Sequence, residues 1–369
     1  MIKYKEIESE KELLQVIESS NGGISTYAFQ NLDFNTVESL ITDKVFLDCI
    51  FLGCKIPENL NSNISKDCLV FPNIEAPYNP FRNCLYTPES LFKNYEYGKP
   101  ESYENTLDKV VYNHYIETGK EANDIKETLS RRLHDHSITN ALYDFISNYD
   151  ERKLVAIMGG HSLLRDDKNY LEVAKISKKL TEAGYLMISG GGPGAMEATH
   201  VGAWMAGKKE EDLIKAVKIL TDAPSYKDKH WLDKSFEVLE LYPKTVFESL
   251  GIPTWLYGHE PPSPFATKIA KYFANSVRED GLLTIAKGGI IFTPGSAGTV
   301  QEIFQEVTQN HYLSFRYASP MVFFNTNFWT NTIPIIPFFD RMIEEGTFQN
   351  ILISKCNNYM EVFEAIESF

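Results

Sequence analysis

The chain has 369 residues, of which 43% are hydrophobic and 23% are charged, and its net charge is −14. This composition is ordinary for a globular protein with one large domain or two of medium size. The acidic balance disfavours a DNA or RNA polymer as partner, although local N–H groups can still bind a small phosphorylated ligand. No apolar run is long enough to cross a membrane, and residues 1–18 lack the apolar core of a signal peptide. We therefore expect a cytoplasmic protein without a membrane partner.

Cysteine and histidine spacing gives little sign of a metal centre. The cysteines are odd in number and lack CxxC spacing, so we expect reduced, structural thiols rather than disulfides or a zinc site; they are Cys49, Cys54, Cys68, Cys84 and Cys356. The only histidine cluster, His134-Asp135-His136, is interpreted as the polar side of a helix, with metal binding as a minority alternative.

Residues 1–120 differ from the rest of the chain. An amphipathic helix is predicted at 11–19, and the short apolar runs at 44–54 and 68–71 are separated by proline and asparagine. This pattern predicts a smaller N-terminal α/β module without catalytic features, which could act as a cap or in dimerisation. Residues 120–149 are predicted to form a helical linker to about residue 150, with these buried positions: Leu129, Leu133, Ile138, Leu142 and Phe145.

Residues 151–369 alternate between strand and helix patterns. Strands are predicted at 154–158, 185–188, 252–257, 289–293, 321–325 and 351–354. Helices are predicted at 170–183, 198–207, 212–220, 265–277, 298–309, 335–345 and 359–368. Repeated βα units require parallel strands with helices on both faces, so the fold class is α/β with a doubly wound, Rossmann-like parallel sheet. Ligands of such sheets bind at the carboxyl ends of the strands.

Three glycine-containing turns follow predicted strands and should converge on one crevice. The first contains Gly159, Gly160 and His161. The second spans 189–197, with Ser189, Gly190, Gly191, Gly192, Gly194 and Met196 as candidate ligand contacts. The third follows the strand at 289–293, with Pro294, Gly295, Ser296, Gly298 and Thr299 as candidates. A strand, a glycine turn and a helix together direct backbone N–H groups at a phosphate. Two such turns suggest one ligand held between two helix N-termini.

The common nucleotide motifs fit this chain poorly. Residues 190–195 satisfy the pattern G-x-G-x-x-[GA], but the dinucleotide fingerprint belongs on the first strand, with an acidic residue after the next one. Here the first strand carries the turn at Gly159 instead. The chain also lacks G-x-x-x-x-G-K-[ST], so both NAD and a triphosphate held in a P-loop are disfavoured.

The paired turns resemble those of the Lonely Guy (LOG) family, long described as lysine decarboxylase-like. Residues 294–302 (PGSAGTVQE) resemble its PGGxGTxxE motif, and residues 189–197 (SGGGPGAME) resemble its preceding glycine turn. The form SGGGPGAMEA is most similar to the pyrimidine/purine nucleotide 5′-monophosphate nucleosidase branch. The resemblance covers about 153–369 and implies a LOG-type Rossmann domain.

The resemblance implies a hydrolase that splits a nucleoside 5′-monophosphate into free base and ribose 5-phosphate, without a cofactor or metal. The 5′-phosphate would bind the third turn, with the Thr299 hydroxyl as a further donor. Glu302 would stabilise the sugar cation and orient or deprotonate water, and Arg278 would clamp phosphate or help the base depart. The family also implies a homodimer or larger homo-oligomer.

Several alternatives remain open at this point. Glu302 could merely complement the helix dipole, and Arg278 could be a solvated surface arginine. Glu197 could cap its helix or reach the ligand, and His161 could contact the ligand or cap a strand. Residues 255–264 could cover a base or form a rigid, proline-rich connection.

One departure from the family motif bears on the activity. Ser296 replaces the second glycine of PGGxGT, which favours altered substrate geometry or a non-catalytic nucleotide-binding or sensing protein of the same fold. A literal lysine decarboxylase is disfavoured, because Lys287 is the only lysine near either turn and lacks a pyridoxal phosphate context.

Overall fold

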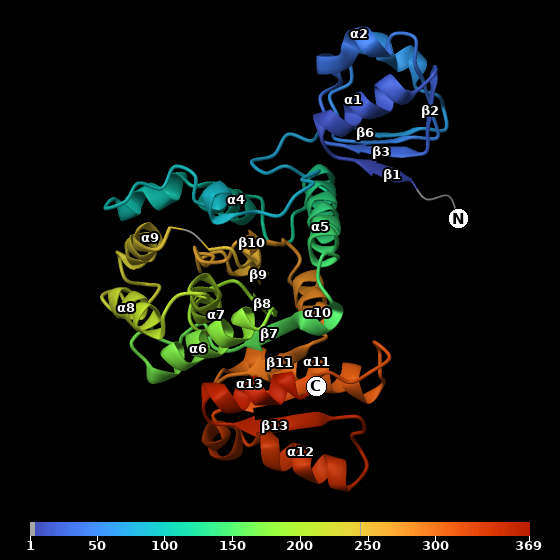
Figure 1. Cartoon of the computed structure of the whole chain (residues 1–369). Coiled ribbons are helices and arrows are strands. Elements are labelled where there is room, and N and C mark those ends of the chain that lie inside the picture. The colour runs from blue at the N-terminus through green and yellow to red at the C-terminus, as the bar shows by residue number, and fades with distance from the viewer. Residues whose placement is uncertain (1–3, 244) are drawn as a thin grey trace. The chain divides into compact units, whose positions relative to one another are not determined.

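The structure is a computed structural model that describes residues 4–243 and 245–369. The chain divides into two compact units, each built from two stretches of sequence (Figure 1). Unit 1 consists of Met1–Leu85 and His114–Tyr143, and unit 2 of Tyr86–Asn113 and Asp144–Phe369. The division falls within helix α4 (Leu107–Glu117) and within helix α5 (Ile125–Ile146).

Unit 1 is a small α/β module of short parallel strands. Its elements are β1 (Lys5–Ile7), α1 (Glu10–Ser19), β2 (Gly23–Ser25), β3 (Tyr27–Gln30), α2 (Glu38–Ile41), β4 (Val45–Leu47), β5 (Ile50–Leu52) and β6 (Leu69–Phe71). The strands form a four-stranded sheet in the order β1-β3-β5-β6 and a two-stranded sheet of β2 and β4. Rings of Phe29, Phe34, Phe46 and Phe51 pack against one another in its core.

Helix α5 buries polar side chains that sequence spacing placed at its surface. His134 and Asp135 are buried, and a hydrogen bond of 3.2 Å joins His134 Nδ1 to Asp135 Oδ1. The interpretation of this cluster as the polar side of a helix is therefore wrong for these two residues, although His136 is exposed. Ile138 and Leu142 are buried as predicted, whereas Leu129 is 52% exposed. Mutual hydrogen bonding makes such burial of polar groups tolerable.

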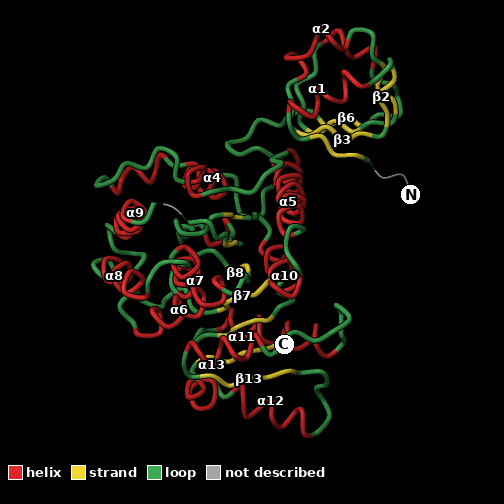
Figure 2. Tube along the Cα trace, viewed as in Figure 1, coloured by secondary structure: helices red, strands yellow, loops and turns green. Residues whose placement is uncertain are grey.

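Unit 2 contains the doubly wound parallel sheet that the sequence predicts. Its strands are β7 (Leu154–Met158), β8 (Leu186–Ser189), β9 (Ser249–Gly251), β10 (Lys268–Ile269), β11 (Gly289–Phe292), β12 (Pro320–Phe324) and β13 (Leu352–Cys356). Their order is β10-β9-β8-β7-β11-β12-β13, and each neighbouring pair is parallel. Figure 2 shows β7, β8 and β13 of this sheet in yellow. The winding direction reverses between β7 and β11, which makes their carboxyl ends the expected ligand position.

Helices alternate with these strands along the chain. They are α3 (Pro88–Leu91), α6 (Lys168–Glu182), α7 (Ala195–Trp204), α8 (Glu210–Leu220), α9 (Trp231–Leu241), α10 (Asn275–Ile285), α11 (Ala297–His311), α12 (Ile335–Glu344) and α13 (Tyr359–Glu367). Buried residues of α6, α7, α8 and α13 join alternate strand residues, among them Val155, Ile157 and Met187, in one hydrophobic core. Strands β7, β8, β9, β11 and β12 are buried on both faces, as expected of a parallel sheet, whereas the edge strand β13 is largely exposed or half-buried.

Two predicted elements are wrong. The strand expected at 252–257 is replaced by β9, which ends at Gly251, and by a short 3₁₀ helix at Trp255–Tyr257. The helix expected at 265–277 is replaced by β10, and α10 begins only at Asn275. The backbone here is used for strand pairing, because the Ala270 N–H donates to Gly251 O and the Tyr272 N–H donates to Pro253 O. Local apolar spacing did not reveal this pairing.

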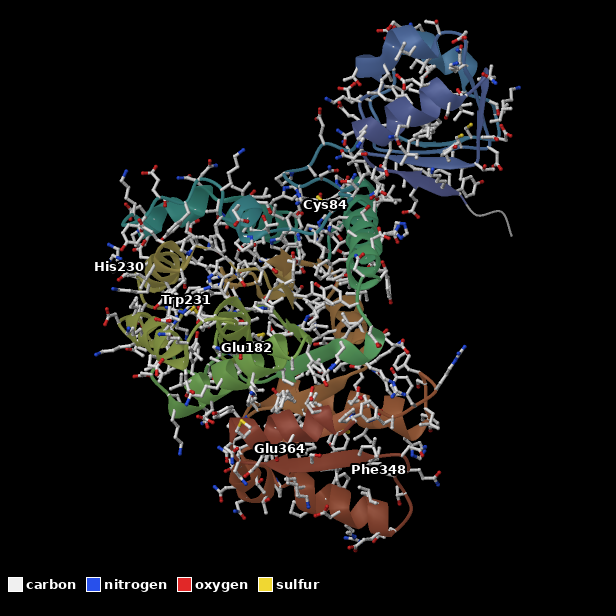
Figure 3. All side chains as sticks on the ribbon, in the orientation of Figure 1. Cys84, Glu182, His230, Trp231, Phe348 and Glu364 are labelled. Atoms are coloured by element: carbon white, nitrogen blue, oxygen red, sulfur yellow. The ribbon has the colours of Figure 1, made fainter. Side chains whose placement is uncertain are left out.

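Two absences hold for the described ranges 4–243 and 245–369. No helix there is both long and apolar enough to cross a membrane. The five cysteines, all within these ranges, are free. Burial raises the pKa of the Cys49, Cys54 and Cys356 thiols to about 11, so these three are inert core groups. Cys84, labelled in Figure 3, is exposed.

Candidate functional site

A cavity of about 420 Å³ lies in unit 2, among the segments that follow β7, β8, β9 and β11. Its lining residues are Gly159, Gly160, His161, Gly190, Gly192, Met196, Pro253, Thr254, Tyr257, His259, Glu260, Arg278, Glu279, Ser296, Gly298, Thr299 and Glu302. All three glycine turns contribute to this set. The volume is in the range of pockets that bind small molecules.

The turn after β7 connects the other two turns. The Gly160 N–H donates to Pro294 O at 3.2 Å, and the Gly160 carbonyl accepts from the Ala195 N–H at 3.2 Å. The β11 turn and the start of α7 are therefore held together through one residue. His161, the next residue, lines the cavity and is 48% exposed on its side chain.

Ser189 stabilises the turn after β8 through hydrogen bonds. It is fully buried and does not line the cavity. Its Oγ accepts from the Gly191 N–H at 3.0 Å and lies 2.8 Å from His200 Nε2, while His200 Nδ1 lies 2.9 Å from Ser249 Oγ. Burial lowers the pKa of His200 to about 3, so this imidazole is neutral. The chain of hydrogen bonds positions the turn and leaves Gly190, Gly192 and Met196 at the cavity.

Gly191 and Gly194 also serve the fold of this turn and do not line the cavity. Both adopt a φ of 72°, which is unfavourable for other residues. A Cβ on Gly194 would lie 2.4 Å from the carbonyl oxygen of Gly160. These two glycines are explained by backbone geometry alone.

Glu197 takes neither of the roles considered for it. Its carboxylate is fully buried and accepts from Arg165 Nε at 2.9 Å and from the Tyr170 hydroxyl at 2.7 Å. Arg165 is also buried and donates to the carbonyl oxygens of Ala223 and Trp231. Arg165 and Glu197 therefore form a buried, structural ion pair at the start of α7. Trp231, labelled in Figure 3, lies 4.4 Å from the Arg165 guanidinium by its ring centroid.

The turn after β11 is open toward the cavity. Ser296 is the N-cap residue of α11 and makes no side-chain cap hydrogen bond. Ser296, Gly298 and Thr299 line the cavity, whereas Pro294 and Gly295 do not. The first N–H groups of a helix have no partner within the helix and carry its positive dipole end. This helix start can therefore bind an anion.

Arg278 and Glu302 face each other in the cavity. Arg278 Nη1 lies 3.9 Å from Glu302 Oε1, and the side chains are only 11% and 17% exposed. Arg278 Nε is buried without a hydrogen-bond partner among the described residues, so Arg278 is not a solvated surface side chain. Burial raises the pKa of Glu302 to about 7, an effect that Arg278 opposes and Glu279 reinforces. The carboxyl group can therefore exchange a proton near neutral pH.

One wall of the cavity was only partly anticipated from sequence. Tyr257, His259 and Glu260 line it, whereas Trp255 is fully buried. Glu260 Oε1 lies 3.8 Å from His161 Nε2 and 3.7 Å from His259 Nε2. The sequence prediction singled out residues 255–264 but missed the other contributors, namely Pro253, Thr254 and Glu279. The signal available for Pro253 and Thr254 was their place after β9, the strand beside β8.

These observations define unit 2 as a Rossmann-like α/β module with a polar cavity at the point where the strand order reverses. Neither a family model nor a curated protein matches the sequence.

Among the solved structures that are similar to this chain are the following three, each of which covers 58% of it. The structural-genomics target TM1055 has a TM-score of 0.37 and 18% identity, with 99% of its own chain covered. The molybdenum cofactor binding protein from the phototrophic bacterium Rippkaea orientalis has a TM-score of 0.36 and 12% identity, with 95% covered. The molybdenum cofactor carrier protein from Chlamydomonas reinhardtii has a TM-score of 0.33 and 13% identity, with 96% covered.

Proposed function

We propose that unit 2 hydrolyses the N-glycosidic bond of a nucleoside 5′-monophosphate, giving the free base and ribose 5-phosphate. One observation carries the proposal. Arg278 and Glu302 lie 3.9 Å apart in a cavity that also contains the uncapped start of α11. An anion site, a cation and a proton-exchanging carboxyl group are thereby combined in one pocket. The LOG-like motifs at 189–197 and 294–302 support the same activity.

The 5′-phosphate is assigned to the start of α11. Its first N–H groups and the Thr299 hydroxyl supply donors, and the helix dipole favours the negative charge. A Cβ built on Gly298 meets no atom within 4 Å, so the fold itself does not require glycine there. A ligand in contact with the backbone at this position accounts for the absence of a side chain.

Glu302 is assigned the activation of the water molecule that attacks the sugar. As a carboxylate it orients water and takes its proton as the water oxygen bonds to C1′. The bond between C1′ and the base nitrogen breaks, and its electron pair leaves with the base, which is then protonated from solvent or from a group in the cavity. The carboxylate also stabilises the positive charge that develops on the sugar ring. Arg278 neutralises the phosphate or the departing base.

The base is assigned to the wall formed by Tyr257, His259, Glu260 and His161. This wall combines an aromatic ring with groups that can donate and accept hydrogen bonds, which are the features that bases require. The sugar is assigned to the Arg278–Glu302 pair, between the phosphate and the base.

The proposal is tested by incubating the full chain with a panel of ribonucleoside monophosphates and measuring released base and ribose 5-phosphate. We expect turnover that falls by about 10²–10⁴-fold in Glu302→Gln. Glu306→Gln is the matched control: Glu306 lies on the same helix, burial also raises its pKa to about 7, and it does not line the cavity. The proposal is wrong if no monophosphate is cleaved, or if the two variants lose activity equally.

A second candidate function is nucleotide binding without turnover, and Ser296 favours it. This side chain lines the cavity where the LOG motif has glycine, so it can hold a ligand away from Glu302. Calorimetry with the same nucleotides separates the two functions. Binding that is unchanged in Glu302→Gln, together with absence of cleavage, supports sensing.

The homo-oligomer that the LOG resemblance implies is likewise a proposal. Sedimentation velocity of the full chain tests it: a single monomeric species at micromolar concentration would contradict it.

A further inference from the structure

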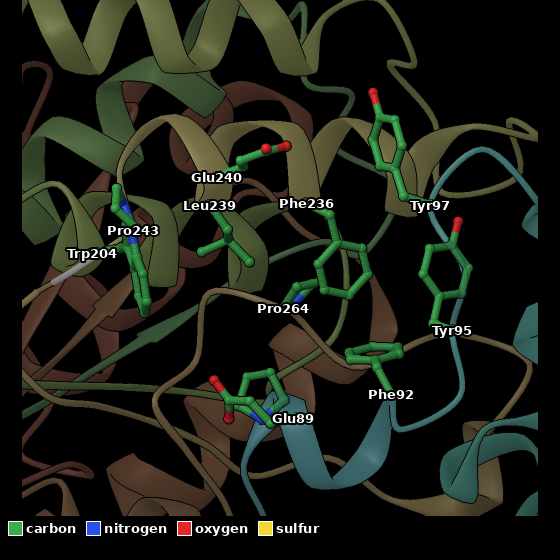
Figure 4. A pocket seen from close by; sticks show the side chains of 11 residues that line it. Glu89, Phe92, Tyr95, Tyr97, Trp204, Phe236, Leu239, Glu240, Pro243 and Pro264 are labelled. Atoms are coloured by element: carbon green, nitrogen blue, oxygen red, sulfur yellow. The ribbon is translucent and has the colours of Figure 1, made fainter.

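A second cavity, of about 430 Å³, lies elsewhere in unit 2 (Figure 4). It is lined by Pro88, Glu89, Phe92, Tyr95, Tyr97, Trp204, Phe236, Leu239, Glu240, Pro243 and Pro264. We call it the aromatic groove. It shares no lining residue with the cavity that contains Glu302, so it is a separate site.

Aromatic rings form one wall of the groove. Tyr95 and Phe236 stack with centroids 5.2 Å apart, and Phe92 meets Phe236 edge-on at 5.8 Å and 88°. The Tyr95 hydroxyl donates to Asp233 Oδ1 at 2.8 Å, and Trp204 Nε1–H donates to the Tyr242 carbonyl at 2.9 Å. Because these polar atoms already have partners within the protein, the two rings offer mainly their apolar surfaces to a ligand.

The groove carries negative charge and no positive charge among its described lining residues. Among the described lining residues, Glu89 and Glu240 are the only ones with carboxyl groups, and both are exposed. No ion pair or side-chain hydrogen bond among the described residues engages either carboxylate. Figure 4 shows Glu240 and Glu89 on opposite sides of Leu239 and Pro264. The described lining residues therefore offer a ligand hydrogen-bond acceptors and aromatic rings, but no cationic side chain.

We infer that the aromatic groove binds a small organic cation whose charge is carried by an alkylated ammonium group. The aromatic rings attract a cation through their quadrupoles, and the two carboxylates add direct Coulomb attraction. Alkyl groups suit the apolar floor of proline and leucine side chains, where a strongly hydrated ammonium would lose its water. A metal ion is a poor fit, since Ca²⁺ requires about six to eight oxygen ligands. An anionic ligand would be repelled.

The test uses choline and 3,3-dimethylbutan-1-ol, which has the same shape without the charge, in calorimetric titration of the full chain. We expect saturable choline binding in the millimolar range or tighter, and at least about tenfold weaker binding of the neutral alcohol. The double variant Glu89→Gln/Glu240→Gln should lower choline affinity at least about tenfold while leaving weak binding of the alcohol unchanged.

Two controls separate this site from the proposed catalytic cavity. Glu302→Gln should leave choline binding unchanged, because Glu302 does not line the groove. Circular dichroism verifies that the double variant is folded. If the double variant does not fold, the comparison of choline with the neutral alcohol on the unmodified chain still tests the inference. The inference is overturned by equal affinity for the two ligands, by choline binding that survives the double substitution, or by absence of choline binding at millimolar concentration.

Discussion

The two glycine turns after β8 and β11 look alike in sequence but differ in what surrounds them. In the first, Ala195 N–H is bonded to Gly160 O, and Glu197 is closed into an ion pair with Arg165. Neither helix start has a side-chain cap, but in the second turn Glu302 lies 3.9 Å from Arg278 and makes no closer ion pair among the described residues. The helix start after β11 therefore has a carboxyl group available to a ligand, whereas the carboxylate at the start of α7 is already paired.

The difference teaches that a glycine turn provides close backbone approach but does not by itself make a binding site. What decides the role is whether the N–H groups and the adjacent carboxylate already have partners. At the β8 turn, the Gly191 and Ala195 N–H groups and the Glu197 carboxylate have partners within the protein, so these groups serve the scaffold. The β11 turn leaves donors and a carboxyl group for a ligand.

The largest effect on stability is expected from the scaffold turn. Glu197→Gln leaves the Arg165 guanidinium buried without its counter-charge, which should lower the free energy of unfolding by about 3–5 kcal/mol. Urea denaturation monitored by circular dichroism measures the change. A free energy of unfolding for Glu197→Gln that is not below that of Glu302→Gln at neutral pH would contradict the assigned contrast between the two carboxylates.

The next largest effect concerns Glu302 and depends on pH. Burial raises its pKa from 4.5 to about 7, so the folded state holds a proton that the unfolded chain releases. The raised pKa lowers the free energy of unfolding progressively as pH rises from about 4.5 to 7. Above pH 7 this loss of stability is about 3 kcal/mol. Glu302→Gln should therefore stabilise the protein at about pH 8, with the gain vanishing toward pH 4.5.

The same pKa predicts the pH profile of any turnover. If the carboxylate is the active form, the rate should fall as pH drops through about 7. Unfolding curves and rates at several pH values test both statements. A pH-independent difference in stability between Glu302→Gln and the unmodified chain would show that the carboxyl group is not perturbed as described.

A smaller effect distinguishes two glycines. Gly194→Ala introduces a Cβ at a φ of 72° and against the Gly160 carbonyl, and should cost about 1–3 kcal/mol of stability. Gly298→Ala meets open space and replaces glycine in a helix, so it should be neutral or stabilise by up to about 1 kcal/mol. Gly298→Ala should nevertheless weaken nucleotide binding. Thermal melts combined with calorimetry measure both quantities, and equal melting temperatures for the two variants would contradict the contrast.

The smallest effect is expected from Ser296→Gly, which restores the glycine of the LOG motif. Removing this exposed side chain from the cavity should raise nucleotide affinity or turnover by a few-fold, with stability changing by a few tenths of a kcal/mol. Parallel binding and activity assays measure it. A decrease in affinity would indicate that the hydroxyl contacts the ligand directly.

Much of the fold of unit 2 could be predicted, and the reason is periodicity. Alternating apolar runs and helical spacing identified β7, β8, β11, β12 and β13, and repeated βα units dictate parallel strands. The segment 252–277 was mispredicted because pairing between β9 and β10, which apolar spacing does not reveal, fixes its conformation. Helix α9 was missed, although its buried Trp231, Leu232, Ser235 and Val238 follow helical spacing.

The sequence by itself determined the Rossmann-like sheet and drew attention to its glycine turns, because both follow from local patterns of apolar residues and glycine. Only the tertiary structure decided that Ser189 and Glu197 serve the scaffold while Glu302 and Arg278 face a cavity. Burial and pairing depend on residues far away in the chain, such as Arg165 for Glu197 and His200 for Ser189. The pKa of Glu302 has the same origin, since desolvation arises only when separate elements pack together.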